Sequence, residues 1–94
     1  MPTAVASHIL VPTEEQANDL KQQIADGADF ADLAKEHSSC PSGKTGGSLG
    51  QFNKGDMVPE FDAAIFSDLP LGVVSDPVKT QFGYHLIEVQ QRMM

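Results

Sequence analysis

The two ends of the chain carry the same pattern of apolar and polar positions. Residues 4–11 and 84–90 are rich in valine, isoleucine and leucine, and they alternate in character as half-buried β-strands do. Each run holds one histidine, His8 in the first and His85 in the second. Neighbours on paired antiparallel strands bring their Cβ atoms to about 4.5–5.5 Å. We therefore predict that these strands pair and that the two imidazoles meet under a shallow groove.

Between the two runs, apolar residues recur at helical spacing in three segments. Thr13 and Gln16 form a capping box at the start of the first helix, and Gly27 is a natural stop at its end. Asp29 is placed to cap the second helix. Pro59 suits the first position of the third helix, because its missing N–H needs no partner there. The pattern predicts three short amphipathic helices.

The remaining segments are rich in glycine, serine and proline. Residues 38–55 predict a long loop that contains a short strand at 49–52. A turn is expected at 69–72, followed by a short strand at 73–79 that Pro77 confines to a sheet edge. The predicted order is therefore β-α-α-β-α-β-β, an α+β fold in which helices pack on a small sheet.

Length, composition and charge argue against several classes of partner and function. With 94 residues, the chain is expected to form one domain over 1–94. Its net charge of −7, without a basic cluster, argues against nucleic acid, anionic membrane surfaces and acidic substrates. No apolar run approaches the roughly 18 residues of a membrane span. One cysteine and no export signal predict a cytoplasmic protein, and nothing in the pattern requires more than a monomer.

The histidines and the cysteine could support several kinds of chemistry. A single strand histidine is commonly a satisfied, partly buried residue, but two in matched settings favour a shared site. Cys40 fits either a small buried apolar role or a thiol facing the groove, and no local signature of a cysteine hydrolase is present. No short-spaced ligand pair indicates a metal site. Gly43-Lys44-Thr45 resembles the end of a phosphate-binding loop, but Ser38 stands where that motif needs glycine.

Apolar side chains near loops favour a concave binding site. Met57 and Phe61 lie four residues apart at a helix start, so they share a face, for which core packing is the usual explanation. Leu49, Phe52 and Phe82 also stand at loop or turn edges. Such a set suits a flat apolar ring better than a charged ligand.

Five segments together resemble a single-domain parvulin, a peptidyl-prolyl cis/trans isomerase. They occur in that family's order and spacing between about Ala6 and Arg92. The segments are Ser7-His8-Ile9-Leu10-Val11, Phe30-Ala31-Asp32-Leu33-Ala34, Gly46-Gly47-Ser48-Leu49-Gly50, Met57-Val58-Pro59-Glu60-Phe61 and Phe82-Gly83-Tyr84-His85-Leu86-Ile87.

The resemblance implies a four-stranded, mainly antiparallel sheet surrounded by helices, and it implies roles for nine residues. These are a proline-ring pocket of Leu49, Met57 and Phe61, a catalytic floor of His8 and His85 with Cys40 and Thr80 close by, and Phe52 and Phe82 on the flanks of the groove. The expected partners are proline-containing peptides and unfolded protein segments, and no cofactor or metal is expected.

One segment departs from a pattern found in part of the family. Some parvulins carry a basic cluster after the first strand, which selects a phosphorylated residue before proline. Here that loop is Pro12-Thr13-Glu14-Glu15, which is short and acidic. We therefore expect an uncharged or apolar residue before proline and no dependence on phosphate. A proline-peptide binding module without catalysis, a small metal or redox protein and a structural interaction domain remain as alternatives.

Overall fold

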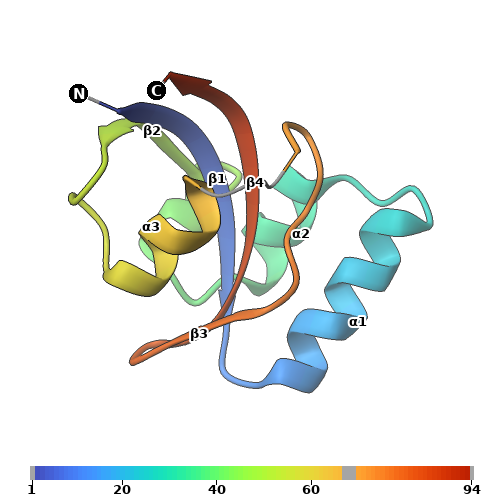
Figure 1. Cartoon of the computed structure of the whole chain (residues 1–94). Coiled ribbons are helices and arrows are strands. Elements are labelled where there is room, and N and C mark those ends of the chain that lie inside the picture. Colours follow the sequence, from blue (N-terminus) through green and yellow to red (C-terminus); the bar gives the residue numbers. More distant parts are fainter. Residues whose placement is uncertain (1, 67–69, 94) are drawn as a thin grey trace.

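Two long antiparallel strands form the centre of the fold. The computed structural model describes residues 2–66 and 70–93. In it, β1 (Thr3–Val11) and β4 (Gly83–Met93) lie side by side, and both ends of the chain lie at the same end of the molecule (Figure 1). The shorter strands β2 (Ser48–Asn53) and β3 (Val78–Thr80) form the two edges, in the order β2-β1-β4-β3. All three strand pairs are antiparallel.

The helices cover both faces of this sheet. Helices α1 (Glu14–Ala25) and α2 (Phe30–His37) pack on one face, and α3 (Pro59–Ile65) packs on the other (Figure 1). The predicted caps are confirmed, since Thr13 Oγ1 accepts the third backbone N–H of α1 at 3.2 Å and Asp29 Oδ2 does the same for α2 at 3.1 Å. These local interactions explain where both helices begin.

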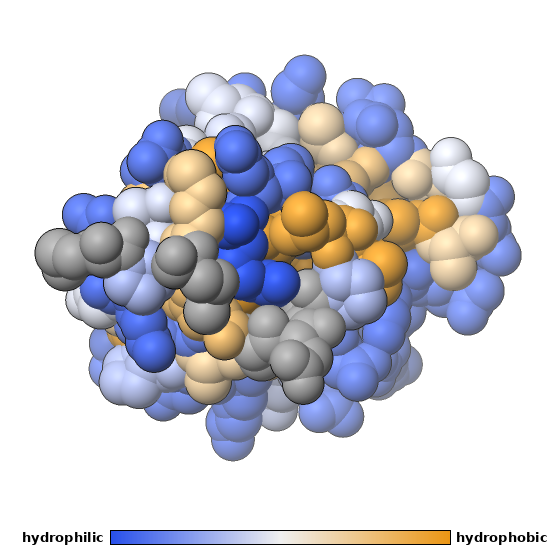
Figure 2. Space-filling model, turned by 45° about the horizontal axis from the view of Figure 1, so that its top comes forward, coloured by the Kyte–Doolittle hydropathy of each residue, from blue (hydrophilic) through white to orange (hydrophobic). Residues whose placement is uncertain are grey.

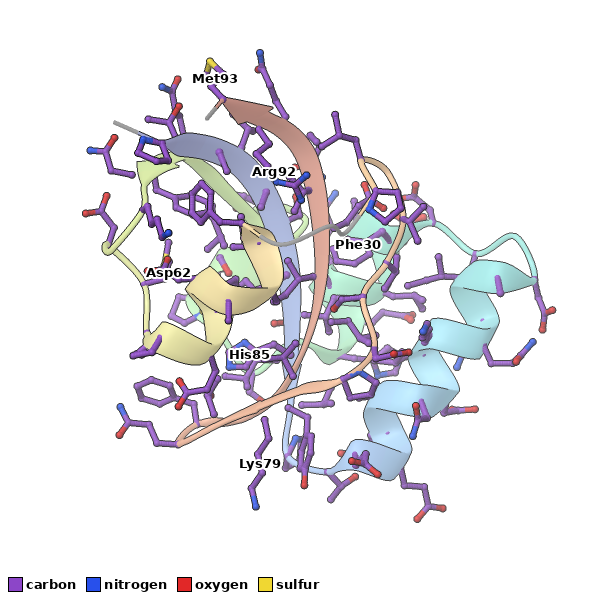
Figure 3. The ribbon with its side chains drawn as sticks, in the orientation of Figure 1. Phe30, Asp62, Lys79, His85, Arg92 and Met93 are labelled. Carbon is purple, nitrogen blue, oxygen red and sulfur yellow. The ribbon has the colours of Figure 1, made fainter. Side chains whose placement is uncertain are left out.

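The sheet divides the core into two apolar clusters. The cluster under α1 and α2 contains Ile9, Val11, Ala17, Leu20, Phe30, Leu33, Ala34 and Leu86. The cluster under α3 contains Ala4, Ala6, Phe52, Phe61, Ile65, Ile87 and Val89. Because side chains alternate along a strand, β1 and β4 each supply residues to both clusters. The view in Figure 3 shows Phe30 on the α2 side of the central strands.

The predicted element order is confirmed, with two local corrections. The segment expected to be a plain loop contains a 3-10 helix, η1 (Pro41–Thr45), before β2. The strand expected at 73–79 is shorter: Val74 forms an isolated bridge with Glu88, and regular pairing begins only at Val78. Of the turn predicted at 69–72, residue 69 lies outside the described residues.

The face of the molecule shown in Figure 2 is mainly hydrophilic. Figure 2 shows one apolar area bordered by hydrophilic residues on the face that it presents. The large apolar side chains that are exposed among the described residues are Leu71, Val73, Phe82 and Met93. No helix in the described part of the chain is long and apolar enough to cross a membrane.

Candidate active site

An irregularity in the sheet shapes the site. In the β1–β2 pairing, Ala6 faces Gly50 and Ser7 faces Ser48, so Leu49 is an extra residue in β2. Such a bulge bends a strand and redirects side chains, and here Leu49 lines a groove. Just before it, Gly47 has a φ of +85° and its carbonyl accepts the His8 N–H at 2.9 Å. A Cβ on Gly47 would lie 2.3 Å from the His8 carbonyl oxygen, so only glycine permits this close approach.

The two histidines meet as predicted, but as diagonal neighbours. His8 faces Ile87 in the β1–β4 pairing, and His85 faces Leu10. Their Nδ1 atoms lie 3.0 Å apart in a hydrogen bond, and both residues are 4% exposed. The rings are nearly parallel, with an interplanar angle of 14°. Residues 77 positions apart therefore form one buried imidazole pair.

A hydroxyl group lies at each outer end of this pair. Thr80 Oγ1 is 2.8 Å from His85 Nε2, and Ser42 Oγ is 3.0 Å from His8 Nε2. The chain of hydrogen bonds therefore runs through Ser42, His8, His85 and Thr80. Sequence reasoning identified three of its four members and missed Ser42. No spacing rule links Ser42 to His8, and only the fold of η1 brings them together.

Both imidazoles are held neutral near pH 7. Burial, with a smaller contribution from the neighbouring His85, lowers the pKa of His8 from 6.5 to about 4. Burial also lowers the pKa of His85. The described residues place no carboxylate in hydrogen-bond contact with either ring. A neutral pair orients its neighbours through N–H and lone-pair directions rather than through charge.

An apolar groove lies over the imidazole pair. Its cavity has a volume of about 440 Å³, within the usual range for small-molecule sites. Its lining residues are His8, Leu10, Ser39, Cys40, Pro41, Leu49, Met57, Val58, Phe61, Phe82 and His85. The Phe61 ring stands edge-on to both imidazoles, with centroid distances of 5.3 Å to His8 and 5.1 Å to His85. Figure 3 shows His85 in the region between α3 and β3.

Most of the residues expected in the site are brought together. Leu49, Met57 and Phe61 line the groove, and Phe82 lies at its edge with 63% of its surface exposed. Thr80 is buried and does not line the groove, but it touches His85 and accepts the Phe82 N–H at 3.2 Å. These positions fit a ring pocket placed above a polar network.

Two expectations need correction. Phe52 does not flank the groove: it is 7% exposed and packs in the core under α3. It pairs with Ala4, four residues along β1 from His8, which corresponds to about 13 Å of strand. Cys40 does line the groove, but its thiol forms no hydrogen bond with the described residues, so it is not part of the imidazole network. Ser42, two residues later, forms the hydrogen bond to His8 instead.

The ligand-type side chains of the described residues do not form a metal centre. Among residues 2–66 and 70–93, no group of three or more histidine, cysteine, aspartate or glutamate side chains is arranged to hold an ion. The two histidines bond to each other and to hydroxyl groups, which uses all four of their ring nitrogens.

Comparison with known proteins assigns the family and the fold. Residues 3–93 match the model of the PPIC-type PPIase domain, which is nearly the whole chain. The chain belongs to this family. It is a parvulin-type peptidyl-prolyl cis/trans isomerase domain, which confirms the resemblance found in the sequence.

Relatives of this parvulin domain include much longer proteins. It is 51% identical over 88 residues to the foldase protein PrsA of Exiguobacterium sibiricum, covering 93% of the chain and 29% of that protein. It is 49% identical over 92 residues to PrsA of Geobacillus kaustophilus, covering 97% and 32%. The chain thus spans about a third of the length of these foldases.

The solved structures similar to this chain include a longer protein and a protein of about the same length. A peptidylprolyl isomerase (PrsA) from Bacillus anthracis superposes with a TM-score of 0.94 at 41% identity, covering 99% of this chain and 43% of the other. NmPin, the parvulin of Nitrosopumilus maritimus, superposes with a TM-score of 0.86 at 40% identity, covering 97% and 98%. The second comparison matches the two chains along almost their whole lengths, so the parvulin fold accounts for nearly all of this chain.

Proposed function

We propose that this domain accelerates the cis/trans isomerisation of Xaa–Pro bonds in peptides and unfolded protein segments, without a covalent intermediate or a cofactor. The observation that supports this best is an open apolar groove of ring-binding size whose floor is a neutral imidazole pair. The PrsA relatives are described as foldases, which agrees with a role in protein folding.

The energetics define what such a site must do. Rotation about a peptide bond has a barrier of about 18–20 kcal/mol, because it breaks amide resonance. The two isomers of an X–Pro bond differ by only about 0.5–1 kcal/mol. A catalyst therefore needs to stabilise only the twisted amide, and a thousandfold acceleration needs roughly 4 kcal/mol of differential stabilisation.

In the proposal, the apolar residues and the histidines of the groove act on different parts of the substrate. Leu49, Met57 and Phe61 hold the proline ring, so that the preceding carbonyl is the part that turns. The twisted amide loses part of its dipole, and an apolar, water-poor groove disfavours it less than it disfavours the planar amide. His8 and His85 then orient polar atoms beneath the turning carbonyl without adding a charge.

The other two catalytic candidates are Thr80 and Cys40. Thr80 acts through its hydrogen bond to His85, and Cys40 contributes surface beside the turning carbonyl. Neither role requires a thiolate or an alkoxide, which is consistent with a mechanism that forms no covalent bond.

The same lining supports a preference for an uncharged residue before proline. The described lining residues of the groove include no lysine or arginine that could pair with a phosphate. The loop after β1 is acidic as well, with Glu14 and Glu15 both exposed. A phosphorylated residue before proline would therefore lack a cationic partner among these residues.

A panel of short peptides tests both parts of the proposal. Exchange between cis and trans isomers is measured by NMR for Leu-Pro, Glu-Pro and phosphoserine-Pro peptides with catalytic amounts of protein. We expect the Leu-Pro peptide to be the best substrate and the phosphorylated peptide the poorest. Preferred catalysis of the phosphorylated peptide would contradict the specificity, while leaving the reaction itself in place.

A methionine pair supplies the matched control for the pocket. Met57→Ala removes a side chain that lines the groove, and we expect kcat/KM for the Leu-Pro peptide to fall roughly tenfold, as for the loss of about 1.4 kcal/mol of binding to the transition state. Met93→Ala changes an exposed methionine at the end of β4 and should leave kcat/KM unchanged. Equal activities would remove Met57 from the proposed pocket.

The monomeric state and the cytoplasmic location belong to the same proposal. Size-exclusion chromatography with light scattering tests the first, and fractionation of cells that express the native gene tests the second.

A further inference from the structure

Met57 lies between two cavities, so packing alone does not hold its side chain in the groove. On one side it lines the groove over the imidazole pair. On the other side it lines a second cavity of about 560 Å³, whose walls include Lys54, Asp62 and Phe66. A methionine side chain is unbranched and flexible, so it can fill either space. Its position therefore depends on the backbone of residues 54–58, the segment between β2 and α3.

The residues before Met57 form a closed turn at the end of β2. The Asn53 N–H donates to Asp56 Oδ2 at 2.9 Å, and the Asp56 N–H donates to the Asn53 carbonyl at 3.1 Å. The Lys54 N–H donates to the Pro2 carbonyl at 2.9 Å, next to the start of β1. These three hydrogen bonds attach the turn to the sheet, and none of them reaches α3.

Asp62, on α3, forms hydrogen bonds with the chain on both sides of Met57. Its Oδ2 accepts the Gly55 N–H at 2.8 Å, and its backbone N–H donates to the Val58 carbonyl at 3.1 Å. Figure 3 shows Asp62 on the side of α3 that faces this segment. Hydrogen bonds from a backbone N–H to a carboxylate belong to the stronger class. Met57 is thus held within a short loop, 55–58, whose two ends are bonded to one residue of α3.

The second oxygen of this carboxylate indicates that the contact serves more than stability. Oδ1 of Asp62 is buried and forms no hydrogen bond with the described residues. A buried acceptor without a partner lowers the stability of the folded state, and this cost offsets part of what the bond to Gly55 contributes. The net contribution of Asp62 to stability is therefore reduced, whereas its effect on the segment that carries Met57 is direct.

We propose that Asp62 is a positioning residue for the ring pocket, which keeps the Met57 side chain in the groove and out of the second cavity. The catalytic consequence rests on the proposed isomerase function. Loss of the carboxylate leaves the Gly55 N–H without its partner in α3, so the Met57 side chain divides between the two cavities. If it occupies the groove for about a third of the time, apparent binding of the proline ring weakens roughly threefold.

A methyl NMR spectrum tests the position of Met57 without any turnover. The chain has four methionines, and the Met57 signal is the one that disappears in Met57→Ala. In Asp62→Ala we expect this signal to shift, because different aromatic rings border the two cavities, whereas the signal of the exposed Met93 should stay in place. An unchanged Met57 signal in folded Asp62→Ala would overturn the inference, whether or not the domain catalyses isomerisation.

Peptide exchange then tests the catalytic consequence. We expect Asp62→Ala to lower kcat/KM for the Leu-Pro peptide roughly threefold, and to have no further effect when Met57→Ala is already present, because the side chain that it positions is then missing. Asp62→Asn, which keeps an acceptor oxygen for the Gly55 N–H, should restore most of kcat/KM.

Glu60→Ala is the matched control, since it removes the same charge from an exposed position of α3 and should leave kcat/KM unchanged. An equal loss in Glu60→Ala, or a loss from Asp62→Ala that persists in the Met57→Ala background, would overturn the positioning role. An Asp62→Asn protein as weak as Asp62→Ala would overturn it as well. Absence of exchange in the wild type would contradict the isomerase proposal alone, and the methyl spectrum would then decide the role of Asp62.

Discussion

The two faces of the sheet are covered to different extents. Helices α1 and α2, of 12 and 8 residues, close one face over a wholly apolar cluster. The other face is covered by α3, which has 7 residues and so is about 10 Å long, whereas the nine residues of β1 extend over about 30 Å. The short helix leaves part of this face open, and the imidazole pair and the groove lie in that part.

Because the two faces are covered differently, a substitution can affect stability alone or stability and activity together. On the closed face, the buried side chains of the cluster are apolar, and none of them lines the groove. On the α3 face, the same side chains can belong to the core and to the site, and Phe61 belongs to both. Substitutions on the two faces should therefore give different combinations of lost stability and lost activity.

The largest effect is expected where the two roles coincide. Phe61→Ala should lower the free energy of unfolding by about 3–5 kcal/mol, because it opens a cavity under α3, and should also remove most isomerisation from the molecules that stay folded. Urea unfolding and peptide exchange measure the two quantities. Ile65→Ala is the control from the same helix. Ile65 is fully buried and does not line the groove, so activity per folded molecule should persist. Equal loss of activity in both variants would contradict the distinction between Ile65 as a core residue and Phe61 as a residue of both core and groove.

A core substitution under α1 and α2 should affect stability without affecting activity. Leu33→Ala should cost about 2–5 kcal/mol of stability, because Leu33 is buried under α2 and its removal leaves a cavity. The rate per folded molecule at low temperature should be that of the wild type. A variant that is folded but inactive would show that the closed face takes part in the chemistry.

Acid should destabilise the domain because His8, which lies on the α3 face, resists protonation in the folded chain. The unfolded chain protonates His8 near pH 6.5, whereas the folded chain keeps it neutral down to about 4. The unfolded state therefore binds more protons in this window, and stability falls as the pH falls, by about 3 kcal/mol for His8 alone. Urea unfolding from pH 7 to 4 measures the decline. His37→Gln, which changes an exposed histidine on α2, should retain it. A flat profile would contradict a buried neutral pair.

The smallest effect is expected at Cys40. Its thiol lines the groove without a hydrogen bond to the described residues, so Cys40→Ser and Cys40→Asp should retain isomerisation within roughly threefold, which is less than 1 kcal/mol. Complete loss of activity in a folded Cys40→Ser protein would instead indicate a nucleophilic thiol.

The sequence predicted the elements that depend on local interactions. Capping residues such as Thr13 and Asp29 act within one turn, and strand alternation marked both histidines, so these features could be derived from short windows. The helix η1 was missed because its glycine and serine content is also typical of loops.

The parts that were missed depend on long-range geometry. Ser42 reaches His8 across 34 positions, and nothing near Ser42 in the sequence signals this contact. Phe52 was misplaced because its role came from the resemblance and from its place near a loop, and neither shows that pairing with Ala4 puts it in the core under α3. The resemblance to parvulins supplied the ring pocket, which composition could not.

We propose that the open α3 face turns a prolyl bond over a neutral imidazole pair. Two-dimensional exchange NMR on a Leu-Pro peptide at pH 7, with the domain at about one hundredth of the peptide concentration, tests this claim most directly. We expect cis–trans exchange cross-peaks that are absent without protein and that weaken roughly tenfold with Met57→Ala. Peptide resonances that shift at higher protein concentration, while exchange stays at the uncatalysed rate, would contradict it and identify a groove that binds proline without turning the bond.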